Sequence, residues 1–300
     1  MKFTIYQESR IGRRVANQDR IAYCYSRDAL LMVIADGMGG HLHGELAAHI
    51  AVQTITGRFR REARPTLAEP LPFLSRAMDH AHQAIIDFAA KRGLPEAPRT
   101  TCVACVVQKN SAHWAHAGDS RLYLLRGQQL LAQTRDHSRV QMLLDQGLID
   151  AVAAAAHPAR NRVFSCLGGG HAPQIDLSRK TPLKTGDIIA LCTDGVWAPL
   201  GNDLLVHALA DANPMLSVPR LLDLAGARAG ENGDNLSLIA MQWGESYAGD
   251  TPSNVSTRTM PLGAVNTEMG EAGKGAADFS DDDIERTINE IRTAIQKFSD

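Results

Sequence analysis

The chain has 300 residues, of which 44% are apolar and 21% charged, and this is enough to bury a large core. Its 31 Lys and Arg nearly balance its 33 Asp and Glu, and no long basic stripe occurs, which argues against a nucleic-acid-binding protein. No apolar run approaches the roughly 18 residues that span a bilayer, and no secretory signal is expected near Met1. We therefore expect no nucleic-acid or membrane partner.

Apolar runs typical of β-strands recur along the first 243 residues. They lie at residues 3–7, 20–25, 30–35, 101–107, 113–117, 121–125, 188–193 and 235–242. Short turns join several of them, which favours antiparallel pairing. Helical spacing of apolar residues is clearest at 73–93, and a second helix is expected from about 45 to 60. Strands interrupted by helices, without a regular strand and helix alternation, predict an α+β architecture.

Four of the five cysteines, at 24, 102, 105, 166 and 192, lie inside apolar strand-like runs. This placement predicts buried thiols in a reducing compartment, and hence a cytoplasmic location. Cys102 and Cys105 also form a CxxC, which in another setting indicates redox chemistry or zinc. Residues three apart on a strand face opposite sides of the sheet, so we expect neither function here.

The composition changes after Trp243. Residues 244–279 are rich in Gly, Ser, Thr, Pro and Ala and have no apolar periodicity, which predicts a flexible linker after a folded domain at 1–243. Residues 280–299 then predict a C-terminal amphipathic helix. Its narrow apolar stripe suits a groove on this protein, a partner helix or a second copy of the chain. The stripe consists of Ile284, Ile288, Ile291, Ile295 and Phe298.

Two strand-like runs end in the same dipeptide, Asp36-Gly37 and Asp194-Gly195. Taken alone, an Asp-Gly after a strand is more simply explained as a hairpin turn. Glycine beside a carboxylate also lets a backbone carbonyl approach a metal ion, which a bulkier residue could hinder. The hairpin and the metal-binding interpretation both stay open at this point.

Three further aspartates, Asp19, Asp119 and Asp234, also stand at strand termini. If all five aspartates converge at one sheet edge, they repel one another unless hard divalent cations neutralise them. Oxygen ligands without Cys or His clusters favour Mg²⁺ or Mn²⁺. Two such ions can bridge and activate a water for attack on phosphorus. Arg14 could supply a bidentate fork for phosphate, although a surface role is the simpler explanation of a lone arginine.

The ordered set of motifs carries a resemblance. The motifs are RVANQD (14–19), ADGMGGHLHGE (35–45), TT (100–101), AGDSR (117–121), TRDHS (134–138), CTDG (192–195) and GDN (233–235). In order and spacing, they resemble the type 2C family of metal-dependent protein serine/threonine phosphatases in its compact bacterial form. The resemblance covers residues 1–243. It implies a four-layer α-β-β-α sandwich, in which two antiparallel sheets are flanked by helix pairs.

The resemblance also implies an activity and a set of ligands. The activity is hydrolysis of phosphoserine and phosphothreonine by a water bridged between two Mn²⁺ or Mg²⁺ ions. Asp36 would bridge both ions and the Gly37 carbonyl would hold one of them, while Asp194 and Asp234 would hold the other. Asp119 would join Asp194 at a third ion.

Two further positions and the partners are implied in the same way. Asp19 would act mainly through water on a metal ion, and Arg14 would bind the phosphate. The expected partners are phosphorylated proteins and a cognate serine/threonine kinase whose action the enzyme reverses.

Several positions depart from the family pattern or invite another explanation. Met38 stands where some members have a histidine proposed as general acid; His41 and His43 are nearby, but helix-entry packing and capping explain them more simply. Residues 136–138, Asp-His-Ser, imitate a hydrolase triad, yet adjacent residues cannot form the required relay. We expect them to order a turn, and residues 147–170 to form a mobile helical lid beside the site.

Two other classes of function compete with the phosphatase. A non-catalytic binding module of the same fold is disfavoured, because such a protein has no reason to keep a repulsive set of carboxylates at 36, 194 and 234. A two-metal nuclease or sugar phosphatase is disfavoured by the missing basic surface and by the order of the motifs.

Overall fold

The computed structural model describes residues 1–38, 43–210 and 213–244. The predicted helix at 280–299 lies outside the described residues, as does the predicted linker beyond Gly244. The division into a domain at 1–243, a linker and a C-terminal helix therefore stays a prediction. Among the described helices, none is both long and apolar enough to cross a bilayer.

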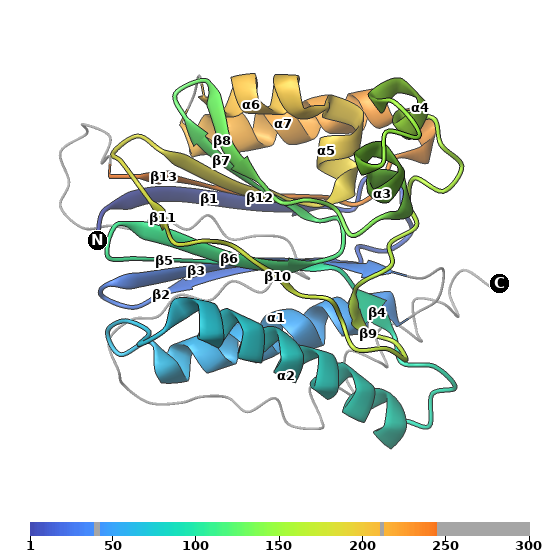
Figure 1. Cartoon of the computed structure of the whole chain (residues 1–300), viewed down its shortest axis with the longest axis horizontal. Helices are drawn as coiled ribbons and strands as arrows, with labels where there is room; N and C mark the ends of the chain where they lie inside the picture. Colours follow the sequence, from blue (N-terminus) through green and yellow to red (C-terminus); the bar gives the residue numbers. More distant parts are fainter. Residues whose placement is uncertain (39–42, 211–212, 245–300) are drawn as a thin grey trace. The chain divides into compact units, whose positions relative to one another are not determined.

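Two antiparallel sheets form the centre of the molecule (Figure 1). The first has the order β1 (Phe3–Arg10), β13 (Leu236–Trp243), β12 (Ile188–Cys192), β7 (Arg121–Arg126) and β8 (Gln129–Gln133). The second has the order β10 (Asp176–Leu177), β6 (Ser111–Ala117), β5 (Cys102–Gln108), β3 (Ala29–Met38), β4 (Arg99–Thr100) and β9 (Leu167–Gly168), with β2 (Asp19–Tyr25) on β3 and β11 (Thr181–Pro182) on β6. The eight strand-like runs read from the sequence all lie in these two sheets.

Helices cover the outer face of each sheet, so the four-layer α-β-β-α sandwich is confirmed (Figure 1). The helices are α1 (Gly44–Glu62), α2 (Pro70–Lys91), α3 (Arg139–Asp145), α4 (Ala151–Ala155), α5 (Asp194–Leu200), α6 (Asn202–Ala210) and α7 (Pro214–Ala229), with a 3₁₀ turn at Gly230–Asn232. The pair α1 and α2 lies on the sheet of β2, β3, β5 and β6, whereas α5, α6 and α7 lie on the other sheet.

Three apolar clusters fill the three interfaces between these four layers. Alternate residues of one strand serve different clusters, because successive side chains point to opposite faces. On β3, Leu31 packs toward α1 and α2, whereas Met32 packs between the two sheets. Cys102 likewise packs toward α1 and α2, and Cys105 packs between the two sheets; both thiols are free and fully buried. This separation rules out a joint disulfide or metal function for the CxxC.

Strand direction brings the predicted aspartates to one edge of the sandwich. Asp19 begins β2 and pairs in register with Asp36, which is near the end of β3. Asp194 follows β12 directly, Asp234 precedes β13, and Asp119 lies in the turn between β6 and β7. Since neighbouring strands run antiparallel, the end of one strand lies beside the start of the next. Both sheets therefore present their acidic ends at the same edge.

The lid expected at residues 147–170 is mostly irregular. Its alanine run forms only the five residues of α4, and Pro158 follows soon after the helix ends. The next stretch is fixed by backbone hydrogen bonds from Arg139 N to Arg162 O (3.0 Å) and from Phe164 N to His137 O (2.8 Å). The predicted helical lid is therefore wrong in its secondary structure, and residues 162–164 pair with residues 137–139 instead.

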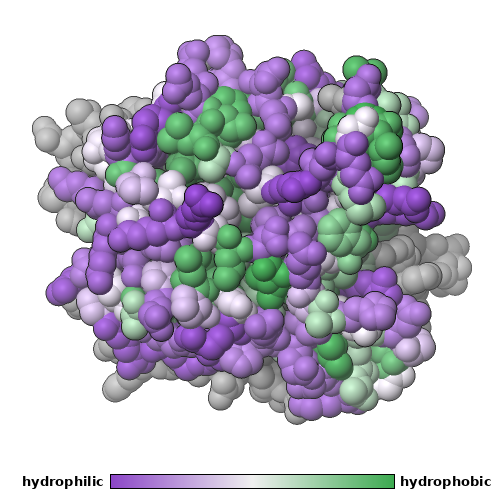
Figure 2. Space-filling view, in the orientation of Figure 1, coloured by the Kyte–Doolittle hydropathy of each residue, from purple (hydrophilic) through white to green (hydrophobic). Residues whose placement is uncertain are grey.

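Figure 2 shows a largely hydrophilic face with separate apolar patches, one of them over α3 and α4. The exposed apolar side chains of this region are Met142, Leu148 and Val152, with exposed fractions of 45%, 65% and 80%. Exposed apolar groups that gather in one patch are typical of surfaces that contact other molecules.

Candidate active site

One cavity of about 270 Å³ lies where the two sheets present their acidic ends. Its lining comes from separate segments of the chain and consists of Arg14, Gln18, Asp36, Gly37, Met38, Asp119, Asn161, Val163, Asp194, Asp234 and Asn235. The predicted site residues Arg14, Asp36, Gly37, Asp119, Asp194 and Asp234 are thus brought together. Asp19 is the one predicted residue that lies behind the lining instead of in it.

Asp19 and Asp36 face each other as an aligned pair on β2 and β3. Asp19 is buried, and its Oδ2 accepts a hydrogen bond from Thr193 Oγ1 at 3.0 Å, while its Oδ1 is buried without a hydrogen-bond partner among the described residues. Burial raises the pKa of Asp19 to about 7. Burial, and then the charges of Asp19 and Asp194, raise the pKa of Asp36 well above its ordinary value.

The pKa values of the carboxyls at the end of the other sheet and in the turn that leads to it are raised for the same reasons. Burial, followed by the charge of Asp234, raises the pKa of Asp194 to about 6. Burial, followed by the charge of Asp194, raises the pKa of Asp119 well above its ordinary value. Several carboxyls whose pKa values are raised by burial and by one another's charge either bind protons or need a neighbouring positive charge to stay ionised at neutral pH.

The two Asp-Gly pairs are not hairpin turns. Asp36 and Gly37 lie within β3, and Asp194 and Gly195 open α5. A Cβ on Gly37 would meet the Gly44 carbonyl oxygen at 2.2 Å, and one on Gly195 would meet the Asn235 carbonyl oxygen at 2.0 Å. Glycine is therefore required at both positions because another backbone segment passes directly over it.

The residues present fit divalent cations. Among the described residues, the cavity lining provides four carboxylates and backbone carbonyls but no histidine or cysteine, which is the oxygen donor set of Mg²⁺ and Mn²⁺. The buried Oδ1 of Asp19 has no hydrogen-bond partner among the described residues, so it is a further oxygen that can accept a hydrogen bond from water. Within the described part of the chain, no three of these carboxylates bring ligand atoms within 4.8 Å of one another. In this arrangement, three of these carboxylates do not surround one ion closely.

Arg14 points its fork at a carboxylate of the site. Its Nε and Nη2 donate to the two carboxylate oxygens of Asp234 at 2.9 and 2.8 Å, and 55% of the Arg14 side chain is exposed. Asn235, which the sequence reasoning did not single out, holds the loop of Arg14. Its Oδ1 accepts from Gln18 N at 2.9 Å, and its Nδ2 donates to the carbonyl oxygens of Ile11 and Ala16 at 2.8 and 3.0 Å.

Asn161 and Val163 form a wall of the cavity that the sequence reasoning did not resolve to residues. Val163 forms an isolated antiparallel bridge with Ser138, whose hydroxyl caps α3 by accepting from Gln141 N at 3.1 Å. Residues 136–138 therefore order a turn, as the sequence predicts, and this turn positions the wall. The side chain of His43, in contrast, makes no capping hydrogen bond at the start of α1.

His116, His137 and Asp176 also gather, with ligand atoms within 4.8 Å of one another. The two imidazole rings stack at 4.6 Å, and His137 Nε2 lies 3.3 Å from a carboxylate oxygen of Asp176. However, Gly118 N donates to His137 Nδ1 at 3.3 Å, and His116 Nε2 lies 2.8 Å from the Arg135 carbonyl oxygen. An imidazole that accepts at Nδ1 carries its proton on Nε2, so the His137 atom facing Asp176 is a donor and not a metal ligand.

Comparison with known proteins identifies the family. Residues 6–218 match the model of protein phosphatase 2C. The chain is 31% identical over 224 residues to the serine/threonine protein phosphatase PstP of Mycobacterium tuberculosis, which covers 75% of this chain and 42% of that protein. It is 32% identical over 234 residues to the protein phosphatase PhpP of Streptococcus pneumoniae, with 76% and 93% covered. The crystal structure of the PstP catalytic domain in complex with two manganese ions matches with a TM-score of 0.68, 28% identity, and 80% and 97% covered.

The chain belongs to the protein phosphatase 2C family, whose members are metal-dependent hydrolases of phosphoproteins. This confirms the family, the fold class and the enzyme class that the sequence predicts. The chain covers less than half of the length of the M. tuberculosis relative. The roles of individual residues, and the substrates and partners of the whole protein, therefore stay proposals.

Proposed function

We propose that this protein is a serine/threonine protein phosphatase that hydrolyses phosphoserine and phosphothreonine side chains of other proteins. The observation that carries the proposal is a cavity in which four aspartates of both sheets stand beside an arginine. Carboxylates that hold divalent ions and a guanidinium fork that matches phosphate are the groups that phosphoester hydrolysis needs.

The aspartates of the cavity hold the ions in this proposal. Asp36, with the Gly37 carbonyl, lies at the centre of the set and would touch both ions, while Asp194 and Asp234 would hold the second. Asp119 would serve a third ion together with Asp194. When bound, the ions supply a water of lowered pKa for in-line attack on phosphorus. Asp19, whose Oδ2 accepts a hydrogen bond from Thr193, would act mainly through water on a metal ion, with its unpartnered Oδ1 as the acceptor.

Arg14 would bind the phosphate of the substrate. In the structure its guanidinium binds both oxygens of Asp234, and two oxygens of a phosphate accept from a guanidinium in the same bidentate way. Phosphate can take the place of this carboxylate once Asp234 turns to an ion. The exposed half of the Arg14 side chain makes this exchange possible without opening the core.

Protonation of the leaving serine or threonine oxygen would come from water. Met38 lines the cavity and has no proton to give, and no histidine lines the cavity within the described residues. His43 lies at the start of α1 outside the lining, and His41 is outside the described residues. A role of either histidine as general acid therefore gains no support.

Phosphoproteins in the cytoplasm are the proposed substrates, and a cognate serine/threonine kinase is the proposed source of their phosphate. Five free cysteines, four of them buried, support a reducing compartment. The apolar patch over α3 and α4, next to the wall of the cavity, supports a protein as substrate in preference to a small phosphate ester.

The test is hydrolysis of phosphoserine, phosphothreonine and phosphotyrosine peptides of one sequence with Mn²⁺, with Mg²⁺ and after chelation. The proposal expects release of phosphate from the first two peptides, loss of activity with the chelator and recovery on adding Mn²⁺. Asp36→Asn is expected to lower kcat at least 100-fold. Activity that persists in the chelator or in the Asp36→Asn variant would contradict the proposal.

A further inference from the structure

The three residues of the turn between β6 and β7, and Arg121 at the start of β7, are held by residues of three other segments of the chain. Gly118 O accepts from His137 N at 2.9 Å, and the carbonyl oxygen of Asp119 accepts from Trp197 Nε1 at 2.9 Å. Ser120 Oγ lies 2.7 Å from the hydroxyl of Thr101, and Arg121 forms a two-pronged ion pair with Asp136. The turn is thus fixed on every side, which is unusual for a surface connection between strands.

The turn fixes the backbone of Asp119, and the Asp119 carboxylate accepts a hydrogen bond from the backbone N–H of the same residue. Within the described residues, no side chain donates a hydrogen bond to the Asp119 carboxylate, although Asp119 is only 6% exposed. The place of this carboxylate therefore depends on its backbone. Gly118 has a φ of +110°, and a Cβ there would meet Thr101 Cβ at 2.5 Å, so the turn packs tightly against the residue that precedes β5.

Trp197 connects this backbone to the helix of another metal ligand. It lies three residues after Asp194 in α5, and its indole Nε1 donates to the Asp119 carbonyl. One hydrogen bond thus spans from the Asp119 turn to the first turn of the helix that Asp194 opens. This contact ties the backbone of Asp119 to the helix that carries Asp194.

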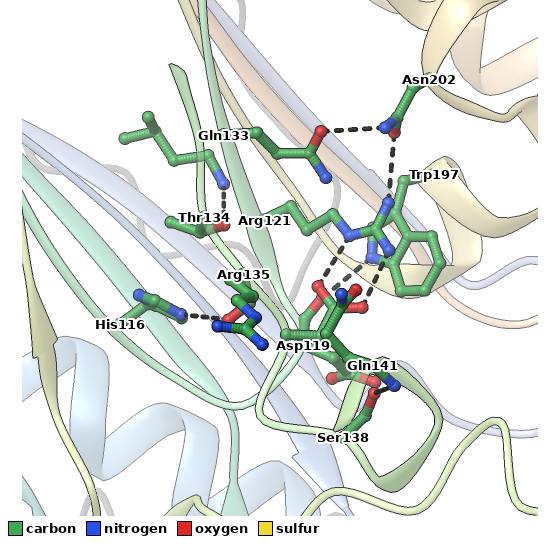
Figure 3. A network of polar contacts seen from close by, with 12 residues as sticks. His116, Asp119, Arg121, Gln133, Thr134, Arg135, Ser138, Gln141, Trp197 and Asn202 are labelled. Carbon is green, nitrogen blue, oxygen red and sulfur yellow. Dashed lines mark hydrogen bonds and ion pairs between the residues drawn. The ribbon is translucent and has the colours of Figure 1, made fainter. Parts of the chain in front are cut away.

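Arg121 keeps Trp197 in place, as Figure 3 shows. Its guanidinium carbon lies 3.5 Å from the centroid of the indole, and its Nε and Nη2 donate to both oxygens of Asp136 at 2.8 Å each. Its Nη1 donates to Asn202 Oδ1 at 3.2 Å, at the start of α6. A desolvated cation on an aromatic face, held by a bidentate carboxylate, is a rigid arrangement.

We propose that Arg121 and Trp197 are positioning residues that set the separation between Asp119 and Asp194, and thereby the affinity for the ion these two share. The proposal rests on the proposed function, because it assumes that both aspartates are metal ligands. Neither Arg121 nor Trp197 lines the cavity, so they act through the Asp119 backbone and not on the substrate. A ligand held about 1 Å from its place binds an ion weakly even when its chemistry is unchanged.

The test compares Mn²⁺ binding by the parent with binding by Trp197→Phe and Arg121→Lys, using electron paramagnetic resonance to count free and bound Mn²⁺. Trp197→Phe keeps the ring under Arg121 but removes the donor to Asp119. Asp119→Asn serves as the reference for loss of the shared ion. We expect both positioning variants to weaken the same class of Mn²⁺ site as Asp119→Asn, by roughly fivefold to tenfold, the equivalent of one hydrogen bond.

Arg126→Lys is the matched control. Arg126 ends the same strand that Arg121 begins, and it makes the same two-pronged pair, with Asp187 at 2.8 and 2.7 Å. It lies at the end of β7 away from the cavity, so Arg126→Lys should leave all Mn²⁺ affinities as in the parent. If Arg121→Lys does not fold, Trp197→Phe decides the question on its own.

The outcomes separate this inference from the proposed function. Unchanged Mn²⁺ affinity in Trp197→Phe, or an equal loss in Arg126→Lys, overturns the inference while the phosphatase proposal stands. A parent protein that binds no Mn²⁺ overturns both. Weakened binding in the two positioning variants at an unchanged melting temperature of the metal-free protein supports positioning over general destabilisation.

Discussion

The indole Nε1 of Trp197 donates a 2.9 Å hydrogen bond to the carbonyl oxygen of Asp119. The two sides of the acidic cavity are therefore assembled by different means. Asp19 and Asp36 are aligned by the register of two neighbouring strands. Asp119 lies in a turn, and a side chain of α5 fixes its backbone. Strand register is difficult to disturb with one substitution. The Trp197 hydrogen bond, in contrast, is lost in Trp197→Phe, which removes the donor Nε1.

Asp36→Asn should lower the affinity for metal ions and raise the stability of the metal-free fold. In the presence of a chelator at neutral pH, removing one charge from the buried set should raise the free energy of unfolding by roughly 1–3 kcal/mol. With saturating Mn²⁺ the order should reverse, because the parent gains the free energy of ion binding and the variant gains less. Denaturant unfolding of both proteins in the two conditions measures the crossing.

Asp79→Asn, at an exposed position of α2, is the control for this pair of measurements. It should shift neither the stability in chelator nor the gain from Mn²⁺ by more than about 0.5 kcal/mol. A metal-free Asp36→Asn protein that is less stable than the parent would show that the carboxylates do not repel one another in the fold.

Arg14→Ala should weaken phosphate binding. Loss of a bidentate guanidinium is expected to lower kcat/KM by about 10- to 100-fold and to raise the inhibition constant of inorganic phosphate in parallel. Arg14→Lys should recover only part of the loss, since an ammonium cannot form the fork. Arg13→Ala is the neighbouring control, because Arg13 is exposed but does not line the cavity. Unaltered phosphate inhibition in Arg14→Ala would remove Arg14 from the binding site.

The strands and the acidic edge could be predicted from the sequence because local patterns encode them. The strand runs are continuous apolar segments, and each aspartate of the cavity stands directly at or beside a strand end. By contrast, the sequence reasoning did not resolve α5 and α7. Both contain an internal proline, Pro199 and Pro219, which interrupts the usual helix signal although the helices continue through them.

The wall of the cavity could not be predicted because no local pattern determines it. Asn161 lies in an irregular segment, and its place depends on hydrogen bonds between residues 162–164 and residues 137–139. The turn at residues 136–138 is itself held by the ion pair of Asp136 with Arg121. Each link joins segments far apart in sequence, so the position of Asn161 follows only from the assembled fold. The alanine run suggested a helical lid for the same reason, since local propensity was the only available signal.

Asn161 should influence protein substrates more than small ones. Its side chain lines the cavity from the wall and is exposed to solvent, where the chain around a phosphorylated residue has to pass. Asn161→Ala is expected to lower kcat/KM for a phosphopeptide by roughly threefold to tenfold and to change hydrolysis of an aryl phosphate by less than about twofold. Asn161→Asp has the same shape but adds a negative charge, and it should raise KM for both substrates. Equal effects of Asn161→Ala on both substrates would contradict a role in recognising the peptide.

His49 should make the fold sensitive to acid. Burial, and then the charge of Arg20, lower the pKa of this imidazole from 6.5 to about 4. Between these two values the unfolded chain binds a proton that the folded chain excludes, so the stabilisation is complete above pH 6.5 and is lost as the pH falls toward 4. His49→Gln cannot take up this proton. Denaturant unfolding at pH 7 and at pH 4.5 should show a larger loss for the parent than for His49→Gln, by roughly 1–3 kcal/mol.

The comparison at acid pH needs a control in which a histidine outside α1 is substituted. His80→Gln changes an exposed histidine of α2 and controls for the substitution itself. The parent and His80→Gln are expected to lose stability together between pH 7 and pH 4.5, with His49→Gln above both at the lower pH. If all three proteins lose the same free energy of unfolding, the imidazole of His49 is hydrated in the fold, and the acid sensitivity arises elsewhere.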